Sequence, residues 1–281
     1  MFGYLIVVSK SDKYDYHAMA FLLAQSIKRT QKAGYDKVAL ATDDEDNISL
    51  YKKSGVYDKV IFWNKKTFWD GRAYMNEITP WEHTVCLDAD MIFQRDYSHW
   101  IEYFVENCEL YIAPKAYTFR GEVITSDYCR KTFTENELPN LYSAYTFFKK
   151  SSTNAHIFFS LAQLITNNPT DFKNLYLTKH IPAVIGTDEA FALAAKIMGI
   201  EDQIAYKLEF PRFVHMKPEL QNFKTPCNKW HLDLGLYYNK YNNLKIGTYN
   251  QDDIIHYVEK DLPIGPLIDN YVDLMKANFK L

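Results

Sequence analysis

The chain has 281 residues, which is enough for one large α/β domain or two small ones with a sizeable core. Its formal net charge of -3 at pH 7 argues against a protein that grips polyanions through its overall charge. The four cysteines are too few for a disulfide scaffold of this size and lack the close pairing of a zinc site, so we expect reduced thiols in a cytoplasmic protein. No apolar run reaches the roughly 20 residues that a membrane-spanning helix needs, so we expect no membrane partner.

Apolar runs alternate with amphipathic segments over the first part of the chain. Strands are predicted at 4–8, 38–42 and 60–63, with helices between them, the second of which ends near Gly55. This spacing is typical of an α/β, Rossmann-like, mostly parallel sheet with helices on both faces. Ligands bind beyond the carboxyl ends of the strands in such sheets, so the loop at 12–17 is a candidate nucleotide pocket.

The pattern continues to the end of the chain with one interruption. We predict a short helix that ends before Pro80, a strand from residue 84, and further elements at 96–107 (helix), 110–114 (strand), 141–148 (strand) and 154–167 (helix). Residues 115–140 have weak periodicity and are predicted to pass over the site. A later helix is expected to begin with Thr187 or Asp188 as its N-cap, and 266–281 is expected to form a closing helix.

The most informative stretch is the apolar run that ends in Asp88 and Asp90. Alternation along an extended chain puts both carboxylates on one side, where they suit a hard divalent cation. The alternative is a pair of Asp residues that cap a loop, since Asp is common where strands end. Arg72 precedes this pair and is expected to contact a carboxylate or a phosphate, with an exposed surface arginine as the alternative.

These residues resemble the glycogenin-like glycosyltransferases of family 8, which have the GT-A fold, use a nucleotide-diphosphate sugar and Mn²⁺, and retain the anomeric configuration. The sequence Cys-Leu-Asp-Ala-Asp at 86–90 is similar to the DxD motif of that family, and Arg72 falls where the family has a basic residue that binds the donor sugar or phosphate. The resemblance implies one GT-A domain over 1–281, with a nucleotide-sugar-binding half at 1–110 and an acceptor-binding half at 111–281.

Other positions match the family in part. Residues 142–144 stand where the family has Asn-Ser-Gly and keep only Ser143, and Asp188 with Glu189 stands where it has Asp-Gln. The resemblance implies that Asp188 contacts the donor sugar near the reacting carbon. Tyr16 is similar in position to an aromatic residue that stacks on uracil, with Tyr14 as the alternative.

The metal shell and the diphosphate contact involve the last part of the chain. The resemblance implies that His256 completes the metal shell with Asp88 and Asp90, and that Lys260 touches the diphosphate. His215 is the competing histidine. An imidazole beside two carboxylates favours Mn²⁺, with Mg²⁺ as the alternative.

The expected activity is therefore a retaining hexosyl or pentosyl transfer from a nucleotide-diphosphate sugar, with UDP as the expected nucleotide, to an acceptor hydroxyl. Arg72 and Lys260 would offset the charge of the leaving diphosphate. The acceptor is a saccharide, a protein or modified DNA.

Three alternatives stay open. Frequent Lys, Tyr, Ile and Asn residues are typical of a protein from an AT-rich genome. One alternative is therefore a phage enzyme that glycosylates 5-hydroxymethylcytosine in DNA in the host cytoplasm. Its basic channel for DNA would use Lys115, Arg120, Arg130 and Lys131. The second is a nucleotidyltransferase, although the loop at 9–17 has no glycine for a phosphate cradle. The third is a binder of nucleotide sugars that has lost turnover.

Overall fold

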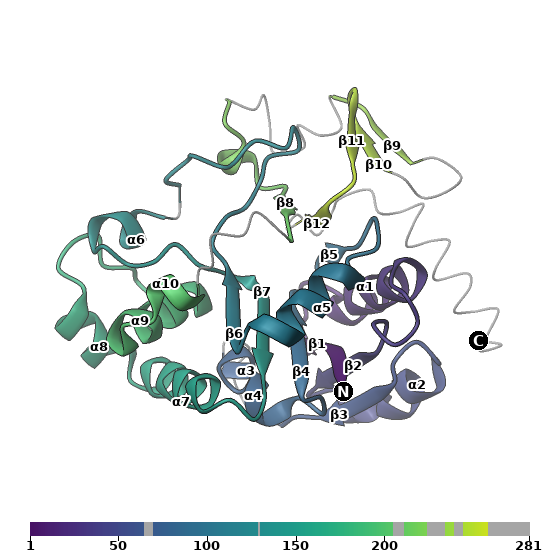
Figure 1. Cartoon of the computed structure of the whole chain (residues 1–281), viewed down its shortest axis with the longest axis horizontal. Coiled ribbons are helices and arrows are strands. Elements are labelled where there is room, and N and C mark those ends of the chain that lie inside the picture. The colour runs from purple at the N-terminus through teal and green to yellow at the C-terminus, as the bar shows by residue number, and fades with distance from the viewer. Residues whose placement is uncertain (65–69, 129, 205–210, 224–233, 239–243, 258–281) are drawn as a thin grey trace.

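A computed structural model describes residues 1–64, 70–128, 130–204, 211–223, 234–238 and 244–257. Its centre is a six-stranded sheet with the order β3-β2-β1-β4-β7-β6 (Figure 1). The strands are β1 (Phe2–Val8), β2 (Val38–Thr42), β3 (Lys59–Phe62), β4 (His83–Leu87), β6 (Leu110–Ala113) and β7 (Tyr142–Lys149). Each of the strands predicted from an apolar run is confirmed within about two residues, the usual uncertainty of an element boundary.

The directions of these strands bring distant residues to one edge of the sheet. Strands β3, β2, β1 and β4 are parallel, so their carboxyl ends share an edge. β7 runs antiparallel to both β4 and β6, and its first residues therefore lie at that same edge. The Asp88 amide donates to the carbonyl of Ala144 at 3.2 Å, which ties the end of β4 to the beginning of β7.

Helices cover both faces of the sheet, as the mixed α/β pattern predicted, and each face has its own apolar core. One core includes side chains of α1 (Tyr16–Thr30) and α5 (Ser98–Asn107), with α2 (Ile48–Lys53) beside it. The other includes α4 (Met75–Ile78), α7 (Thr153–Asn167) and α9 (Thr187–Met198), which lie on the opposite side of the sheet in Figure 1. The shorter helices are α3 (Asp70–Ala73), α6 (Lys131–Glu135), α8 (Pro169–Tyr176) and α10 (Glu201–Ile204), with 3-10 turns η1 (Glu45–Asn47) and η2 (Pro218–Leu220).

Two small sheets lie beyond the central one (Figure 1). The first has the order β5-β12-β8 and consists of β5 (Met91–Ile92), β12 (Ile254–His256) and β8 (Phe213–His215); the second has the order β11-β10-β9 and consists of β9 (Leu236–Tyr238), β10 (Leu244–Ile246) and β11 (Tyr249–Gln251). In the first sheet His256 pairs with Met91 and with His215. The Tyr257 amide also donates to the Asp90 carbonyl at 3.0 Å, so a late strand is joined to the turn that follows β4.

The prediction that Thr187 or Asp188 caps the late helix is wrong. Gly186 is the N-cap of α9, and the Glu189 carboxylate accepts a hydrogen bond of 3.0 Å from the Gly186 amide. This bond satisfies the amide of the N-cap residue by a side chain one turn into the helix, and Thr187 and Asp188 fall within the first turn. Asp188 is thereby left in the first turn, available for other contacts.

Two expectations fall on parts of the chain outside the described residues, namely Lys260 and the closing helix at 266–281. The division into halves at residue 110 stays a prediction. Across the described residues, no helix combines the length and the apolar character that crossing a membrane requires.

Candidate active site

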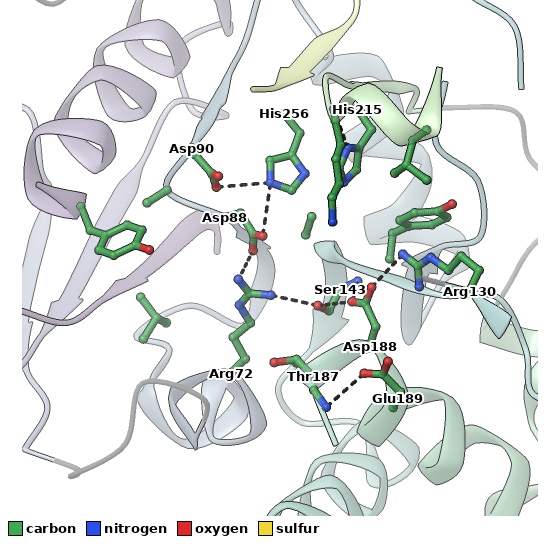
Figure 2. A pocket seen from close by; sticks show the side chains of 18 of the residues that line it. Arg72, Asp88, Asp90, Arg130, Ser143, Thr187, Asp188, Glu189, His215 and His256 are labelled. Carbon is green, nitrogen blue, oxygen red and sulfur yellow. Dashed lines mark hydrogen bonds and ion pairs between the residues drawn. The ribbon is translucent and has the colours of Figure 1, made fainter. Parts of the chain in front are cut away.

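A cavity of ≈ 480 Å³ opens where β1 and β4 end and β7 begins. Its walls come from the ends of these strands, from the first turn of α9 and from the segment after β8 (Figure 2). The volume is within the usual range for small-molecule sites. The position, beyond the carboxyl ends of parallel strands, is the one predicted for a ligand pocket.

Asp88, Asp90 and His256 converge at one end of this cavity (Figure 2). The Nε2 atom of His256 lies 3.6 Å from Asp88 Oδ2 and 3.3 Å from Asp90 Oδ1. One potential ligand atom from each residue lies within 4.8 Å of the others. The sequence correctly predicted that the two carboxylates face one point, but for the wrong reason: β4 ends at Leu87, and a turn between β4 and β5 orients both side chains.

This donor set fits a divalent cation. It combines carboxylate oxygens with one imidazole nitrogen, the set that suits Mn²⁺ and leaves room for further oxygen ligands. Burial raises the pKa of Asp88 above its ordinary value, and the charge of Asp90 raises it further, while Arg72 and His256 oppose the shift. Two carboxylates held together in a buried site are stabilised by a cation between them. Asp88, Asp90 and His256 could therefore hold the ion.

His215 occupies a different position. Its ring lies 4.7 Å from that of His256 between centroids, and its Nδ1 atom accepts a hydrogen bond of 3.3 Å from the Lys217 amide. Burial, and then the charge of His256, lower the pKa of His215 well below its ordinary value, so this ring is neutral. The described residues that could group around a metal include His256 and leave His215 outside.

Arg72 contacts the acidic group and the next part of the cavity wall. Its Nη2 atom lies 2.6 Å from Asp88 Oδ1, and its Nη1 atom donates to Ser143 Oγ at 2.9 Å. The expected contact with a carboxylate is thus present, and the alternative of a surface arginine is wrong. Glycine at position 71 allows α3 to approach β1 closely, because a Cβ atom there would meet Val7 at 2.8 Å.

Asp188 lies at the other end of the cavity and is held by three donors. Its Oδ1 atom accepts from the amide of Ser143 at 2.9 Å and from the hydroxyl of Ser143 at 2.6 Å. Its Oδ2 atom pairs with Arg130 Nη2 at 2.8 Å. Burial alone would raise the pKa of Asp188, but Arg130 and the hydrogen bonds from Ser143 outweigh it and hold the pKa below its ordinary value.

The two tyrosines proposed for the nucleobase lie near the beginning of α1. Tyr16 lines the cavity, whereas Tyr14 lines a separate pocket formed by residues 10–15 and 17. Their rings are 6.0 Å apart in an edge-to-face arrangement. The geometry favours Tyr16 over Tyr14 as a neighbour of a ligand in the main cavity.

Arg130 is the site residue that sequence reasoning missed in this role. The sequence predicts Arg130 only as one member of a basic channel, but it is 8% exposed and pairs with Asp188. Arg120, another member, pairs with Glu122 at 2.9 Å. The weak periodicity of residues 115–140 carries no signal for this ion pair, because Asp188 lies 58 residues further along the chain.

The arrangement of the central sheet and its flanking helices matches the GT-A-like glycosyltransferase folds, as a comparison with three solved structures shows. Mouse xyloside xylosyltransferase 1 in its apo form is 13% identical, with a TM-score of 0.53 over 93% of this chain and 99% of that chain. The apo structure of the bifunctional glycosyltransferase WbbM gives a TM-score of 0.55 at 11% identity, over 97% of this chain and 49% of that one.

Apo GlyE, a glycosyltransferase of Streptococcus pneumoniae TIGR4, gives a TM-score of 0.53 at 10% identity, over 99% of this chain and 63% of that one. At such identities the likeness shows a shared fold. No family model matches the sequence, and no curated protein matches it either.

Proposed function

We propose that this protein is a metal-dependent glycosyltransferase related to family 8, which moves a sugar from a nucleotide-diphosphate sugar to an acceptor hydroxyl with retention of configuration. The observation that carries the proposal is the convergence of Asp88, Asp90 and His256 at the end of β4 in a GT-A-like fold. UDP is the proposed nucleotide, because Tyr16 lines the cavity where the resemblance implies a stacking residue for uracil.

The roles of the acidic group follow from its chemistry. Asp88, Asp90 and His256 would hold Mn²⁺, with Mg²⁺ as the alternative ion. When bound, the ion supplies positive charge to the diphosphate and makes it a better leaving group. Arg72, paired with Asp88, adds a guanidinium group beside the same position, and Lys260 is proposed as a further contact to the diphosphate.

Asp188 is proposed to lie beside the transferred sugar. Its oxygens already accept three hydrogen bonds, and its pKa is held below its ordinary value, so it is a poorly nucleophilic anion. A carboxylate of this kind stabilises positive charge on the sugar carbon rather than forming a covalent bond to it. Retention then requires the acceptor to attack from the face that the diphosphate leaves.

A saccharide or a protein hydroxyl is the proposed class of acceptor. The DNA alternative is weaker, because Arg120 and Arg130 of the expected basic channel each have a carboxylate partner.

The test is a screen for donor hydrolysis with and without Mn²⁺, using UDP-glucose, UDP-galactose, UDP-xylose, UDP-N-acetylglucosamine and GDP-mannose. We expect Mn²⁺-dependent release of UDP from at least one UDP-sugar by the wild-type protein and none by Asp88→Asn. Undiminished Mn²⁺-dependent turnover by Asp88→Asn would contradict the proposal. Calorimetry with UDP then separates a binder without turnover from a protein that binds no nucleotide.

A further inference from the structure

We propose that Arg130 is a positioning residue, which fixes the carboxylate of Asp188 at the sugar side of the cavity. This inference rests on the proposed function. It concerns a residue in the segment between β6 and β7, which neither the acidic motif nor the resemblance involves. On this proposal, turnover depends on the segment between β6 and β7.

Arg130 joins three separate parts of the chain. Its Nη2 atom pairs with Asp188 Oδ2 at 2.8 Å, in the first turn of α9, and its Nη1 atom donates to the carbonyl of Leu141 at 3.0 Å, directly before β7. The backbone of Arg130 is itself the N-cap of α6. One guanidinium group therefore sets the distance between α9, β7 and α6 at the cavity wall.

Two aromatic rings restrict the plane of this guanidinium group. Its central carbon lies 3.8 Å from the centroid of the Tyr142 ring and 4.8 Å from that of Phe133. A planar cation that stacks on rings and donates in its own plane has few orientations left. A lysine ammonium cannot reproduce this geometry, because it is a point charge without a plane.

The consequence for Asp188 follows from a count of its acceptor positions. A carboxylate has about four lone-pair positions. Ser143 takes two on Oδ1 and Arg130 takes one on Oδ2, which leaves about one on Oδ2 for a ligand. Without Arg130, Ser143 alone holds Oδ1, and Oδ2 is free to turn. The orientation of the remaining position therefore depends on Arg130.

A purely structural role for the pair is less consistent with its location. Arg130, Tyr142 and Asp188 all line the cavity, and Asp188 remains 29% exposed at its side chain. Ser143 links this pair to Arg72, so charged groups alternate in sign from Asp88 through Arg72 and Asp188 to Arg130 (Figure 2). The pair continues the site rather than lying behind it.

The first experiment compares Arg130→Met with a matched control, Arg120→Met. Arg120 lies in the same segment, pairs with Glu122 and lies over the ring of Phe223 at 4.9 Å, but it does not line the cavity. We expect Arg130→Met to lower kcat for UDP-sugar hydrolysis about 100-fold, because small displacements of a site group have effects of that size. The KM for the donor is expected to change by less than about threefold, since the nucleotide contacts are elsewhere. Arg120→Met is expected to match the wild-type protein.

A double-mutant cycle distinguishes an effect through Asp188 from an independent one. If Arg130 acts through Asp188, then Asp188→Asn combined with Arg130→Met should be no slower than Asp188→Asn alone. Effects that multiply, or wild-type turnover by folded Arg130→Met, would overturn the inference. Arg130→Lys is the second variant should Arg130→Met fail to fold, and full activity in Arg130→Lys would overturn it equally.

The same variants, measured by thermal unfolding in the absence of metal, separate this inference from the proposed function. If the wild-type protein hydrolyses no donor, the proposed function fails, and the pairing is then decided by the melting temperatures. A buried pair predicts that either single variant lowers the melting temperature by several degrees and that the second change adds little. Additive shifts would show that the two side chains act separately and would refute the positioning role.

Discussion

The cavity has two sides that differ in how their charges are balanced. On the acidic side, formed by Asp88, Asp90 and His256, burial and like charge raise the pKa of Asp88. On the paired side, formed by Ser143, Asp188 and Arg130, burial acts in the same direction, but the arginine and the serine hold the pKa of Asp188 low. The acidic side sets two carboxylates against the guanidinium group of Arg72 and is suited to an added cation, whereas the paired side sets the one carboxylate of Asp188 against Arg130. We infer that a metal acts at one side only.

The largest expected effect comes from removing charge on the acidic side. Asp90→Asn keeps the shape of the side chain but removes one negative ligand, and we expect Mn²⁺-dependent hydrolysis to fall by roughly 1,000-fold. Asp46→Asn is the matched control, since that carboxylate is 83% exposed and contacts Lys10 outside the cavity. The measurement is initial UDP release at saturating Mn²⁺. Equal losses in both variants would contradict the role of Asp90 as a ligand on the acidic side.

The next effect distinguishes the two histidines. His256→Gln should weaken Mn²⁺ binding at least about tenfold, whereas His215→Gln should leave it within about twofold, because among the described residues the group that could hold a metal contains His256 and not His215. Titration of the melting temperature with Mn²⁺ measures both variants without a donor. A larger loss in His215→Gln would reverse the assignment.

A smaller effect is expected where the two sides are joined. Ser143→Ala removes the hydroxyl that accepts from Arg72 and donates to Asp188, but it leaves the Ser143 amide bonded to Asp188. We expect kcat to fall about tenfold through the lost bond to Asp188, the size expected for one hydrogen bond to a charged group. Mn²⁺ affinity should not change. A parallel loss of Mn²⁺ affinity would mean that the two sides are coupled and not independent.

The smallest effect concerns stability at low pH. Because the pKa of Asp188 is lower in the folded protein than its ordinary value of 3.8, the unfolded chain binds the proton first as the pH falls. The stabilisation by Asp188 is complete above that ordinary value and is lost as the pH falls through the folded pKa. The stability difference between the wild-type protein and Asp188→Asn should therefore shrink below about pH 4. Urea titrations at pH 6 and pH 3 test this, and a constant difference would contradict it.

The acidic side could be predicted because its information is local. Asp88 and Asp90 follow a bounded apolar run, and such runs also identified the strands of the central sheet. His256 came from the family resemblance and not from any local pattern. Even here the orientation of the carboxylates was attributed to strand alternation, whereas a turn provides it.

The paired side could not be predicted in the same way. Arg130 lies in a segment without periodicity, and its contacts to Leu141 and Asp188 depend on how α9 and β7 pack. The sequence predicts Thr187 or Asp188 as the N-cap of α9 from residue preference, whereas the local bond between Gly186 and Glu189, three residues apart, marks the start of the helix. Contacts between side chains that are far apart in sequence leave no pattern in a single chain.

The position of His256 has a consequence for the order in which the protein matures. Asp88 and Asp90 belong to the first third of the chain, but β12, which carries His256, comes near its far end and docks beside β5. During synthesis the earlier segments leave the ribosome first. Until β12 has been made, a nascent chain carries Asp88 and Asp90 without His256. On the proposed function, turnover begins only after β12 has paired with β5. Completion of the proposed metal shell therefore awaits the synthesis and docking of one short strand.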